Sequence, residues 1–494
     1  MKIRTIITQD AEVDDQNSLR HFLFYANEVE LQGIVQTSSK FHWKGVPGKV
    51  KPEKERKDDF EMGEDSGPYD APYRWTGTDW MGRVIDDYEK DYPNLSRHAD
   101  GYPTPEYLRS ITKIGNIGYE GEMDAPSEGS ELIRARMLDE DDRPLYLQVW
   151  GGCNTIARAL LDIENAYGAD PDWPALHARL TEKIVITACG EQDPAYREVI
   201  AERWPGIRFV KTLQMMSYAY PWFVMPEGES KDTLRAAFMK KEILNGKSAL
   251  AAGYCTWLDG NRYEGEAEDA QFGANPNIVK EWFGAKMGLP EPAAYDFLSE
   301  GDSPTFFPLL NWGFRTLEDF SYGGIAGRYT RVEGQVNSKG ETLNIWDVCK
   351  DSYTDRDGKT HLVESMWPYV ADIQRDFAAR VAWAGTADPT NAEHAPTLEI
   401  REGLNMTASA GVSVTLRAAA GSPDGTEVEV SFRLYPEASA DCAWEASLTS
   451  SAREAVLTLP EAAEPGDAFH VIVKAQAHGH YRLVHYQQVI VTTV

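Results

Sequence analysis

Cysteine is scarce and scattered in this chain of 494 residues, which contains five. No two of them have the C-x-x-C spacing that is typical of zinc clusters, and they do not form the dense pattern of a disulfide framework. We therefore expect buried free thiols, which pack as small apolar side chains. The five are Cys153, Cys189, Cys255, Cys349 and Cys442.

Positive charge is also in deficit, because 49 Lys and Arg residues face 78 Asp and Glu residues, for a formal net charge of −29. Such a chain repels the phosphate backbone, so we expect no nucleic-acid partner. No apolar run reaches the length of a membrane span, so we expect no membrane partner. Met1 stands close to the first predicted strand and leaves no room for a secretory leader, which predicts a cytoplasmic protein. If a leader has been removed, the protein would be periplasmic or secreted.

What the chain does contain is typical of a globular protein: 42% hydrophobic and 11% aromatic residues. The length predicts a large core domain and a smaller second one.

Four acids follow directly on the first predicted strand, at Asp10, Glu12, Asp14 and Asp15. A helical pattern comes next, with Asp14 or Asp15 as the expected N-cap, and a second strand follows at 31–35. This order predicts a βαβ unit of a mostly parallel sheet. Ligands of such sheets bind beyond the carboxyl ends of the strands, so the acids lie where a site is expected.

Four acids so close together repel one another unless a cation lies among them. Carboxylate oxygens are the ligands that a hard cation such as Ca²⁺ prefers. The alternative is a solvated turn whose Asp residues only cap the helix and favour its dipole. The spacing leaves both interpretations open.

Asp10, Asp14 and Asp15 match the D-x-x-x-D-D core of the nucleoside hydrolase signature. The chain further resembles the nucleoside hydrolase-like branch that is named for cellulose binding. The resemblance implies an α/β domain, with a mostly parallel sheet flanked by helices, and a carbohydrate or glycoside as ligand, and it leaves a homo-oligomer open. The matching blocks follow in the order of the family: 37–45 (TSSKFHWKG), 127–130 (SEGS), 300–304 (EGDSP) and 323–329 (GGIAGRY).

The resemblance also implies a set of ligands for Ca²⁺. Three are the carboxylates of Asp10, Asp15 and Asp302, and the fourth is the backbone carbonyl of Trp150, just before a turn of paired glycines. In this scheme Asp10 is the general base, and Asp14 binds a sugar hydroxyl.

His42 and Trp43 follow the second predicted strand, at the root of a charged segment from 44 to 78. Trp43 could stack on a sugar ring while His42 bonds hydroxyls or passes a proton. Equally, both could anchor the segment, which is either a solvated insertion or a lid.

Further substrate contacts are expected where other strands end. Asn154 follows the turn of paired glycines, and Gln192 and Asp193 follow the strand predicted at 183–189. Arg328, in the Gly-rich block, could bond a carboxylate or sugar hydroxyls.

Gly301 precedes Asp302, where nucleoside hydrolases often carry a His that aids departure of the base. This difference predicts that the leaving group is not a nucleobase. Glu300 is also expected at the substrate. Candidates for the leaving-group acid are Glu191, Asp193, Glu300 and His42.

The hydrophobic period changes from 3.6 to 2 near residue 397, after a last helix predicted at 361–383 and a polar linker. About seven short alternating strands predict an immunoglobulin-like β-sandwich. We therefore expect a domain of residues 1–388 and a second of 397–494, which either packs as a spacer or binds carbohydrate.

Together these features predict a calcium-dependent hydrolase of a glycosidic bond, in an O-linked furanoside or oligosaccharide. One alternative is an N-ribosyl nucleoside hydrolase. Another is a non-catalytic carbohydrate-binding protein with a vestigial hydrolase site.

Overall fold

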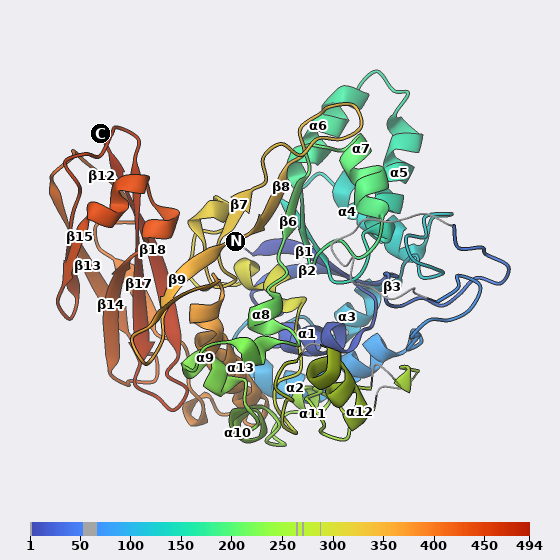
Figure 1. Ribbon diagram of the computed structural model, residues 1–494, viewed down its shortest axis with the longest axis horizontal. Helices are drawn as coiled ribbons and strands as arrows, with labels where there is room; N and C mark the ends of the chain where they lie inside the picture. The colour runs from blue at the N-terminus through green and yellow to red at the C-terminus, as the bar shows by residue number, and fades with distance from the viewer. Residues whose placement is uncertain (1, 53–66, 263–264, 269–270, 287) are drawn as a thin grey trace.

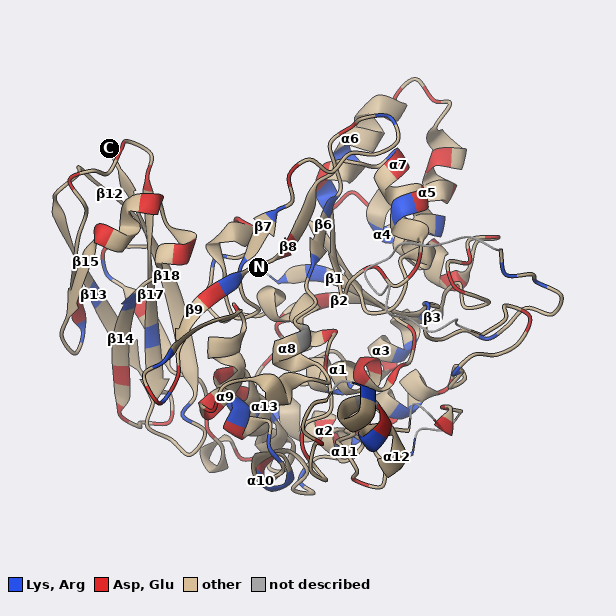
Figure 2. Ribbon diagram, viewed as in Figure 1, with Lys and Arg blue, Asp and Glu red and all other residues tan. Residues whose placement is uncertain are grey.

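The computed structural model describes residues 2–52, 67–262, 265–268, 271–286 and 288–494. An eight-stranded sheet with helices on both faces forms the first part of the chain, and two smaller sheets form the last part (Figure 1). Acidic and basic positions are distributed over both parts (Figure 2). Within the described residues, no helix combines the length and the apolar character that crossing a membrane requires.

The large sheet has the strand order β3-β2-β1-β4-β5-β6-β8-β7. All neighbouring strands pair in parallel except β7, which runs antiparallel to β8 at one edge. The predicted mostly parallel sheet is therefore confirmed. Its strands are β1 Ile3–Gln9, β2 Val29–Gln36, β3 Thr112–Ile114, β4 Leu145–Val149, β5 Ile184–Ala188, β6 Arg208–Lys211, β7 Tyr329–Arg331 and β8 Ile345–Val348.

Strand β1 lies at the point where the chain order reverses, with β2 on one side and β4 on the other. Ile7 pairs with Ile34 of β2, and Thr8 pairs with Val149 of β4. In open parallel sheets a ligand crevice forms at such a reversal, beyond the carboxyl ends of the strands. The acidic turn after β1 begins at this point.

Neighbouring residues of β1 enter different cores, because successive strand side chains point to opposite faces. Ile6 packs in one core with α4 Glu128–Leu138, α5 Asn154–Tyr167, α6 Trp173–Lys183 and the π-helix Tyr196–Ile200, which continues as α7 Ala201–Arg203. Ile7 packs in the other with α1 Val13–Leu23, α2 Trp80–His98, α3 Pro105–Ile111 and α13 Val370–Ala384. Figure 1 shows these two groups of helices on opposite sides of the sheet.

Short helical segments connect β6 to the edge of the sheet. They include α8 Met215–Tyr218, α9 Glu229–Thr233, α10 Ala236–Phe238, α11 Ala249–Ala252 and α12 Pro276–Ile278. Two of them continue as π-helices, at Met239–Ile243 and Val279–Lys286.

The last helix of the first part begins later than predicted. Instead of a helix from 361, the structure has a hairpin of β9 Lys350–Thr354 and β10 Thr360–Glu364, in which His361 pairs with Tyr353. Pro368 then lies in a 3₁₀ turn, and α13 begins at Val370. The predicted start was wrong because Pro368 has no backbone N–H to donate and is accepted only in the first turn of a helix, while residues 360–364 pair with β9 instead.

The end of the chain forms two four-stranded sheets, β11-β13-β16-β15 and β12-β18-β17-β14, which share one apolar core. The predicted all-β C-terminal part is confirmed, and its immunoglobulin-like class stays a prediction. The strands are β11 Thr397–Ile400, β12 Asn405–Ala408, β13 Ser413–Gly421, β14 Val428–Leu434, β15 Ser447–Ser450, β16 Glu454–Thr458, β17 Ala468–Ala477 and β18 Val484–Thr493.

The two parts are joined by buried polar contacts. The Tyr435 hydroxyl donates to Asp351, and Asp372 accepts from the Tyr486 hydroxyl at 2.5 Å and from Lys474 Nζ at 2.8 Å. Tyr435 and Tyr486 also belong to the large core of the first part. The division into 1–388 and 397–494 therefore stays a prediction. All five cysteines are free thiols, and Cys153, Cys189 and Cys255 are buried.

Candidate functional site

The turn after β1 is tight, and α1 begins sooner than the sequence suggests. Ala11 has φ +77°, a left-handed conformation that a residue with a Cβ seldom adopts. Glu12 is the N-cap of α1 and makes no side-chain capping bond. The expected N-cap at Asp14 or Asp15 was wrong, because both lie in the first helical turn. There Asp15 Oδ1 accepts a hydrogen bond from the Asp10 backbone N–H at 2.9 Å.

A third acid reaches this turn from far along the chain. Carboxylate oxygens of Asp14, Asp15 and Asp302 lie within 4.8 Å of one another. Asp302 is fixed by a short relay: its carbonyl accepts from Thr305 Oγ1 at 2.7 Å, and Thr305 Oγ1 accepts from Trp150 Nε1 at 2.7 Å. The loop that carries Asp302 is thereby attached to the end of β4.

These carboxylates are buried, and several of their oxygens lack a hydrogen-bond donor among the described residues. Asp10 Oδ2, Asp14 Oδ1 and Asp302 Oδ2 have no hydrogen-bond partner among the described residues. Burial, followed by the charges of neighbouring acids, raises the pKa values of Asp14, Asp15 and Asp302 well above their usual range. A cation fits such a cluster, because its charge offsets the repulsion and its coordination sphere takes up the free oxygens.

The end of β4 supplies close backbone contacts to the same turn. A Cβ added at Gly151 would lie 2.8 Å from the Asp10 Cβ, and one added at Gly152 would lie 2.2 Å from Asp193 Oδ2. Glycine is therefore required at both positions. The Trp150 carbonyl, expected as a metal ligand, accepts a hydrogen bond from Gln192 Nε2.

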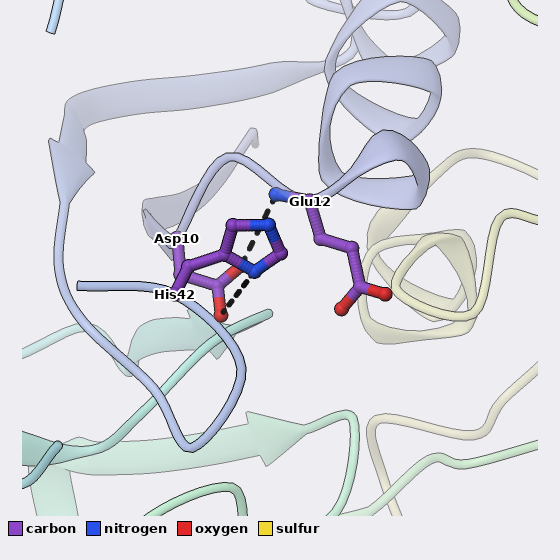
Figure 3. A group of neighbouring side chains, drawn as sticks. All are labelled: Asp10, Glu12 and His42. Carbon is purple, nitrogen blue, oxygen red and sulfur yellow. Dashed lines mark hydrogen bonds and ion pairs between the residues drawn. The ribbon is translucent and has the colours of Figure 1, made fainter. Parts of the chain in front are cut away.

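His42 lies between two carboxylates and is fully buried. Its Nε2 is 3.1 Å from Glu266 Oε1, and its Nδ1 is 4.0 Å from Asp10 Oδ2. Figure 3 shows the imidazole over the Asp10 carboxylate, with Glu12 alongside. Burial acts to lower the pKa of His42, but the charges of Glu266, Asp10 and Glu12 outweigh it and raise the pKa to about 9.

Trp43 makes the contacts that its anchoring alternative expects, and its contact with a sugar stays a prediction. Its ring stacks on Tyr73 with centroids 4.6 Å apart, and its Nε1 donates to the Ala71 carbonyl at 3.1 Å. This buried side chain holds the base of the 44–78 segment. The lid hypothesis concerns the whole segment 44–78, of which residues 53–66 lie outside the described residues, and it stays a prediction.

Asn154 and Asp193 lie close to the acids, but their polar atoms form hydrogen bonds with other groups of the protein. The Asn154 amide bonds the side chains of Thr37 and Ser38 and two backbone carbonyls. Asp193 accepts from the backbone N–H groups of Asn154 and Ala195, and burial raises its pKa to about 7. Both side chains fix the loops around the site, and their contact with substrate stays a prediction.

The side chains of Glu300 and Arg328 bond partners outside the acid cluster. The Glu300 carboxylate accepts from Tyr254 and lies 2.7 Å from His21 Nδ1, inside the core. Arg328 Nη2 pairs with Asp351 at 2.7 Å, next to the C-terminal part. Neither arrangement favours the predicted contact with substrate.

Two contributors to the site received no role from sequence reasoning. Glu12 was counted among the acids of the turn, and its Oε1 accepts from the Tyr220 hydroxyl at 3.1 Å. Glu266 comes from a loop with no motif, so no sequence signal could have identified it. Both belong to the surroundings of His42.

Two known protein families match this chain. The family described as "Cellulose-binding Sde182, nucleoside hydrolase-like domain" matches residues 4–329, and "Cellulose-binding protein Sde0182, C-terminal domain" matches residues 413–493. The first match spans well over half of the chain. The chain belongs to the Sde182 family.

One solved structure has the same fold as this chain. It is a nucleoside hydrolase-related hypothetical protein from Saccharophagus degradans that is associated with carbohydrate metabolism, with 24% identity, full coverage of both chains and a TM-score of 0.70. A plant nucleoside hydrolase is 9% identical over 78% of this chain and 100% of its own, with a TM-score of 0.32. An inosine-guanosine nucleoside hydrolase is 10% identical over 78% of this chain and 98% of its own, with a TM-score of 0.31. The last two scores are too low to support a conclusion. No curated protein sequence matches this chain.

Proposed function

We propose that this Sde182-family protein hydrolyses a glycosidic bond, in an O-linked furanoside or oligosaccharide, and that it depends on Ca²⁺. The observation that supports the proposal is the group of buried, unpartnered carboxylate oxygens on Asp10, Asp14 and Asp302. Without a cation, these acids would be buried against one another at a high electrostatic cost.

The proposed ligands are the carboxylates of Asp10, Asp15 and Asp302 and the carbonyl of Trp150. All four are hard oxygen donors, the class that Ca²⁺ takes. The carbonyl currently accepts from Gln192, so that amide would have to turn away. When bound, the cation would supply orientation of a sugar diol and a lower pKa for water in the site.

The protein's own acids would divide the remaining work. Asp10 Oδ2 has no donor among the described residues, so it is free to accept a proton from an attacking water. Asp14 is 8% exposed, whereas Asp302 is 1% exposed, so Asp14 is the better placed to bond a sugar hydroxyl. A Cβ at Gly301 would lie 3.2 Å from Asp14 Oδ2, so glycine there keeps space beside that carboxylate.

Of the candidates for the leaving-group acid, His42 faces the acid cluster. Glu191 is paired instead with two basic side chains, with Arg197 Nη2 at 2.7 Å and with Lys211 Nζ at 3.1 Å. Glu300 is enclosed by its core partners.

Calorimetric titration with Ca²⁺ tests the proposal, followed by a screen of glycans and nucleosides. We expect binding by the parent, loss of binding in Asp15→Asn, and release of a reducing sugar from a glycan. Unchanged Ca²⁺ affinity in Asp15→Asn would contradict the ligand set. Release of free base from inosine or uridine would instead establish an N-ribosyl hydrolase.

The description of the family as cellulose-binding favours one second candidate, a non-catalytic carbohydrate-binding protein. Asp10→Ala separates the two candidates. If the variant keeps its affinity for a glycan, and the parent turns over nothing on the panel, binding is the function.

A further inference from the structure

We propose that Asp10, Glu12 and His42 form a second cation position, for a first-row transition metal such as Mn²⁺ or Zn²⁺, beside the proposed Ca²⁺ position. The two positions share Asp10. The inference rests on the proposed function only through that shared ligand, and it adds a different class of metal to the site.

Geometry is the first support. One ligand atom from each of the three residues lies within 4.8 Å of the other two, and His42 Nδ1 is 4.0 Å from Asp10 Oδ2. Metal–ligand bonds of about 2.0–2.2 Å place neighbouring donors about 3–4 Å apart, so a small cation fits with minor side-chain rotation. In Figure 3 the ring and the Asp10 carboxylate face each other across this space.

The surroundings of His42 are a second and independent support. The imidazole is fully buried, and its Nδ1 has no hydrogen-bond partner among the described residues. Its other nitrogen, Nε2, lies 3.1 Å from Glu266 Oε1. A histidine that binds a metal usually donates its second N–H to a carboxylate, which fixes the tautomer and points the free lone pair at the metal. Glu266 and His42 have this arrangement.

Charge is a third support. One divalent cation offsets two negative charges, whereas the described residues place six carboxyl groups around the two positions, so a single Ca²⁺ leaves a negative excess. The six groups are Asp10, Glu12, Asp14, Asp15, Glu266 and Asp302.

The donor set determines the class of metal. Imidazole nitrogen with two carboxylates suits Zn²⁺, Mn²⁺ or Fe²⁺, whereas Ca²⁺ takes oxygen. Glu12 is partly exposed while Asp10 and His42 are buried, so we expect a cation to reach the position from the Glu12 side. Filling it would occupy Asp10 Oδ2 and His42 Nδ1, so the general-base role of Asp10 and the leaving-group-acid role of His42 apply to the protein with Ca²⁺ alone.

Equilibrium dialysis against Mn²⁺, in the presence of saturating Ca²⁺, measures the second position directly. We expect one bound Mn²⁺ per chain in the parent and none in His42→Gln. In Glu266→Gln the imidazole stays but its carboxylate partner is lost, and we expect an affinity 10–100-fold weaker, in the range usual for such partners. The buried His470→Gln, in the C-terminal part, is the matched control and should bind like the parent.

¹¹³Cd NMR identifies the ligands without any activity measurement. The parent should show two resonances, and His42→Gln should lose the one that a nitrogen ligand shifts. Asp302→Asn should lose the other, oxygen-only resonance, so failure of the Ca²⁺ position and failure of this one are distinguishable. A single resonance that survives in His42→Gln would overturn the second position. So would Mn²⁺ affinity in either folded variant, His42→Gln or Glu266→Gln, that equals the affinity of the parent, so one folded variant is enough for the comparison.

Discussion

Carboxylate oxygens of Asp15 and Asp302 lie within 4.8 Å of each other, although the two residues come from opposite ends of the first part of the chain. Asp15 is in the first turn of α1, and Asp302 precedes a 3₁₀ turn that Thr305 attaches to Trp150. Both carboxylates are 1% exposed. A pair of acids in this position is tolerated when a positive charge accompanies it.

Replacing Asp302 with Asn should therefore abolish stabilisation by Ca²⁺. At a free concentration 100 times its Kd, a bound ligand adds about 2.7 kcal/mol to the free energy of unfolding. We expect this gain in the parent and no gain in Asp302→Asn, measured by urea unfolding with Ca²⁺ or with a chelator. The exposed Asp100→Asn is the control and should keep the full gain. Equal gains in Asp302→Asn and the parent would place Ca²⁺ elsewhere.

Gly152→Ala should destabilise the protein by about 1–3 kcal/mol, the usual cost of forcing an extra methyl group into filled space. The added Cβ would lie 2.2 Å from Asp193 Oδ2 and 2.5 Å from the Ser38 carbonyl oxygen. Gly82→Ala, in α2, is the control, because its Cβ would meet no described atom within 4 Å. That change should stabilise the protein by about 0.5–1 kcal/mol through helix propensity. Thermal unfolding of both variants should show a lower stability for Gly152→Ala and a higher stability for Gly82→Ala.

His470 should make the protein less stable as the pH falls from about 6.5 to about 4. Burial, and then the charge of Arg315, lowers its pKa to about 4, and Gln488 Nε2 lies 3.0 Å from its Nδ1. In this window the unfolded chain binds a proton that the folded protein does not. The contribution of His470 to the free energy of unfolding is therefore fully present above pH 6.5 and is lost as the pH falls to about 4. The full loss is about 3 kcal/mol for this one group.

Unfolding free energies at pH 7 and pH 4.5 measure that loss. His470→Gln cannot titrate, so its loss over this interval should be smaller than that of the parent. The exposed His478→Gln should lose as much as the parent. Identical losses in the parent and His470→Gln would contradict the lowered pKa.

Tyr435→Phe should destabilise the contact between the two parts by about 1–3 kcal/mol, the cost of leaving a buried acceptor short of a donor. The Tyr435 hydroxyl donates to Asp351, and the other oxygen of Asp351 is held by Arg328. Calorimetric unfolding of the variant measures the loss. Tyr167→Phe, at a more exposed position, should change the stability by less than about 0.5 kcal/mol.

Sequence patterns alone predicted the parallel sheet, the acidic turn after its first strand and the β-strands of the C-terminal part. These features depend on residues that are close together in the sequence. Apolar runs form buried strands, period-2 patterns form half-buried strands, and an acid that directly follows a strand must lie at the end of that strand. The start of α13 was missed because Pro368 interrupts a spacing that otherwise continues.

Whether acids far apart in the chain meet was decided by the tertiary structure. The position of Asp302 was expected through resemblance to a family, and folding brings it to Asp15 by way of Thr305 and Trp150. No pattern indicated that Glu266 reaches His42, or that Arg328 turns away to Asp351. Sequence spacing determines which side chains a single strand or helix presents. The partner of a buried charge is determined by which loops the packed sheet brings to the same edge, and that information is spread over the whole chain.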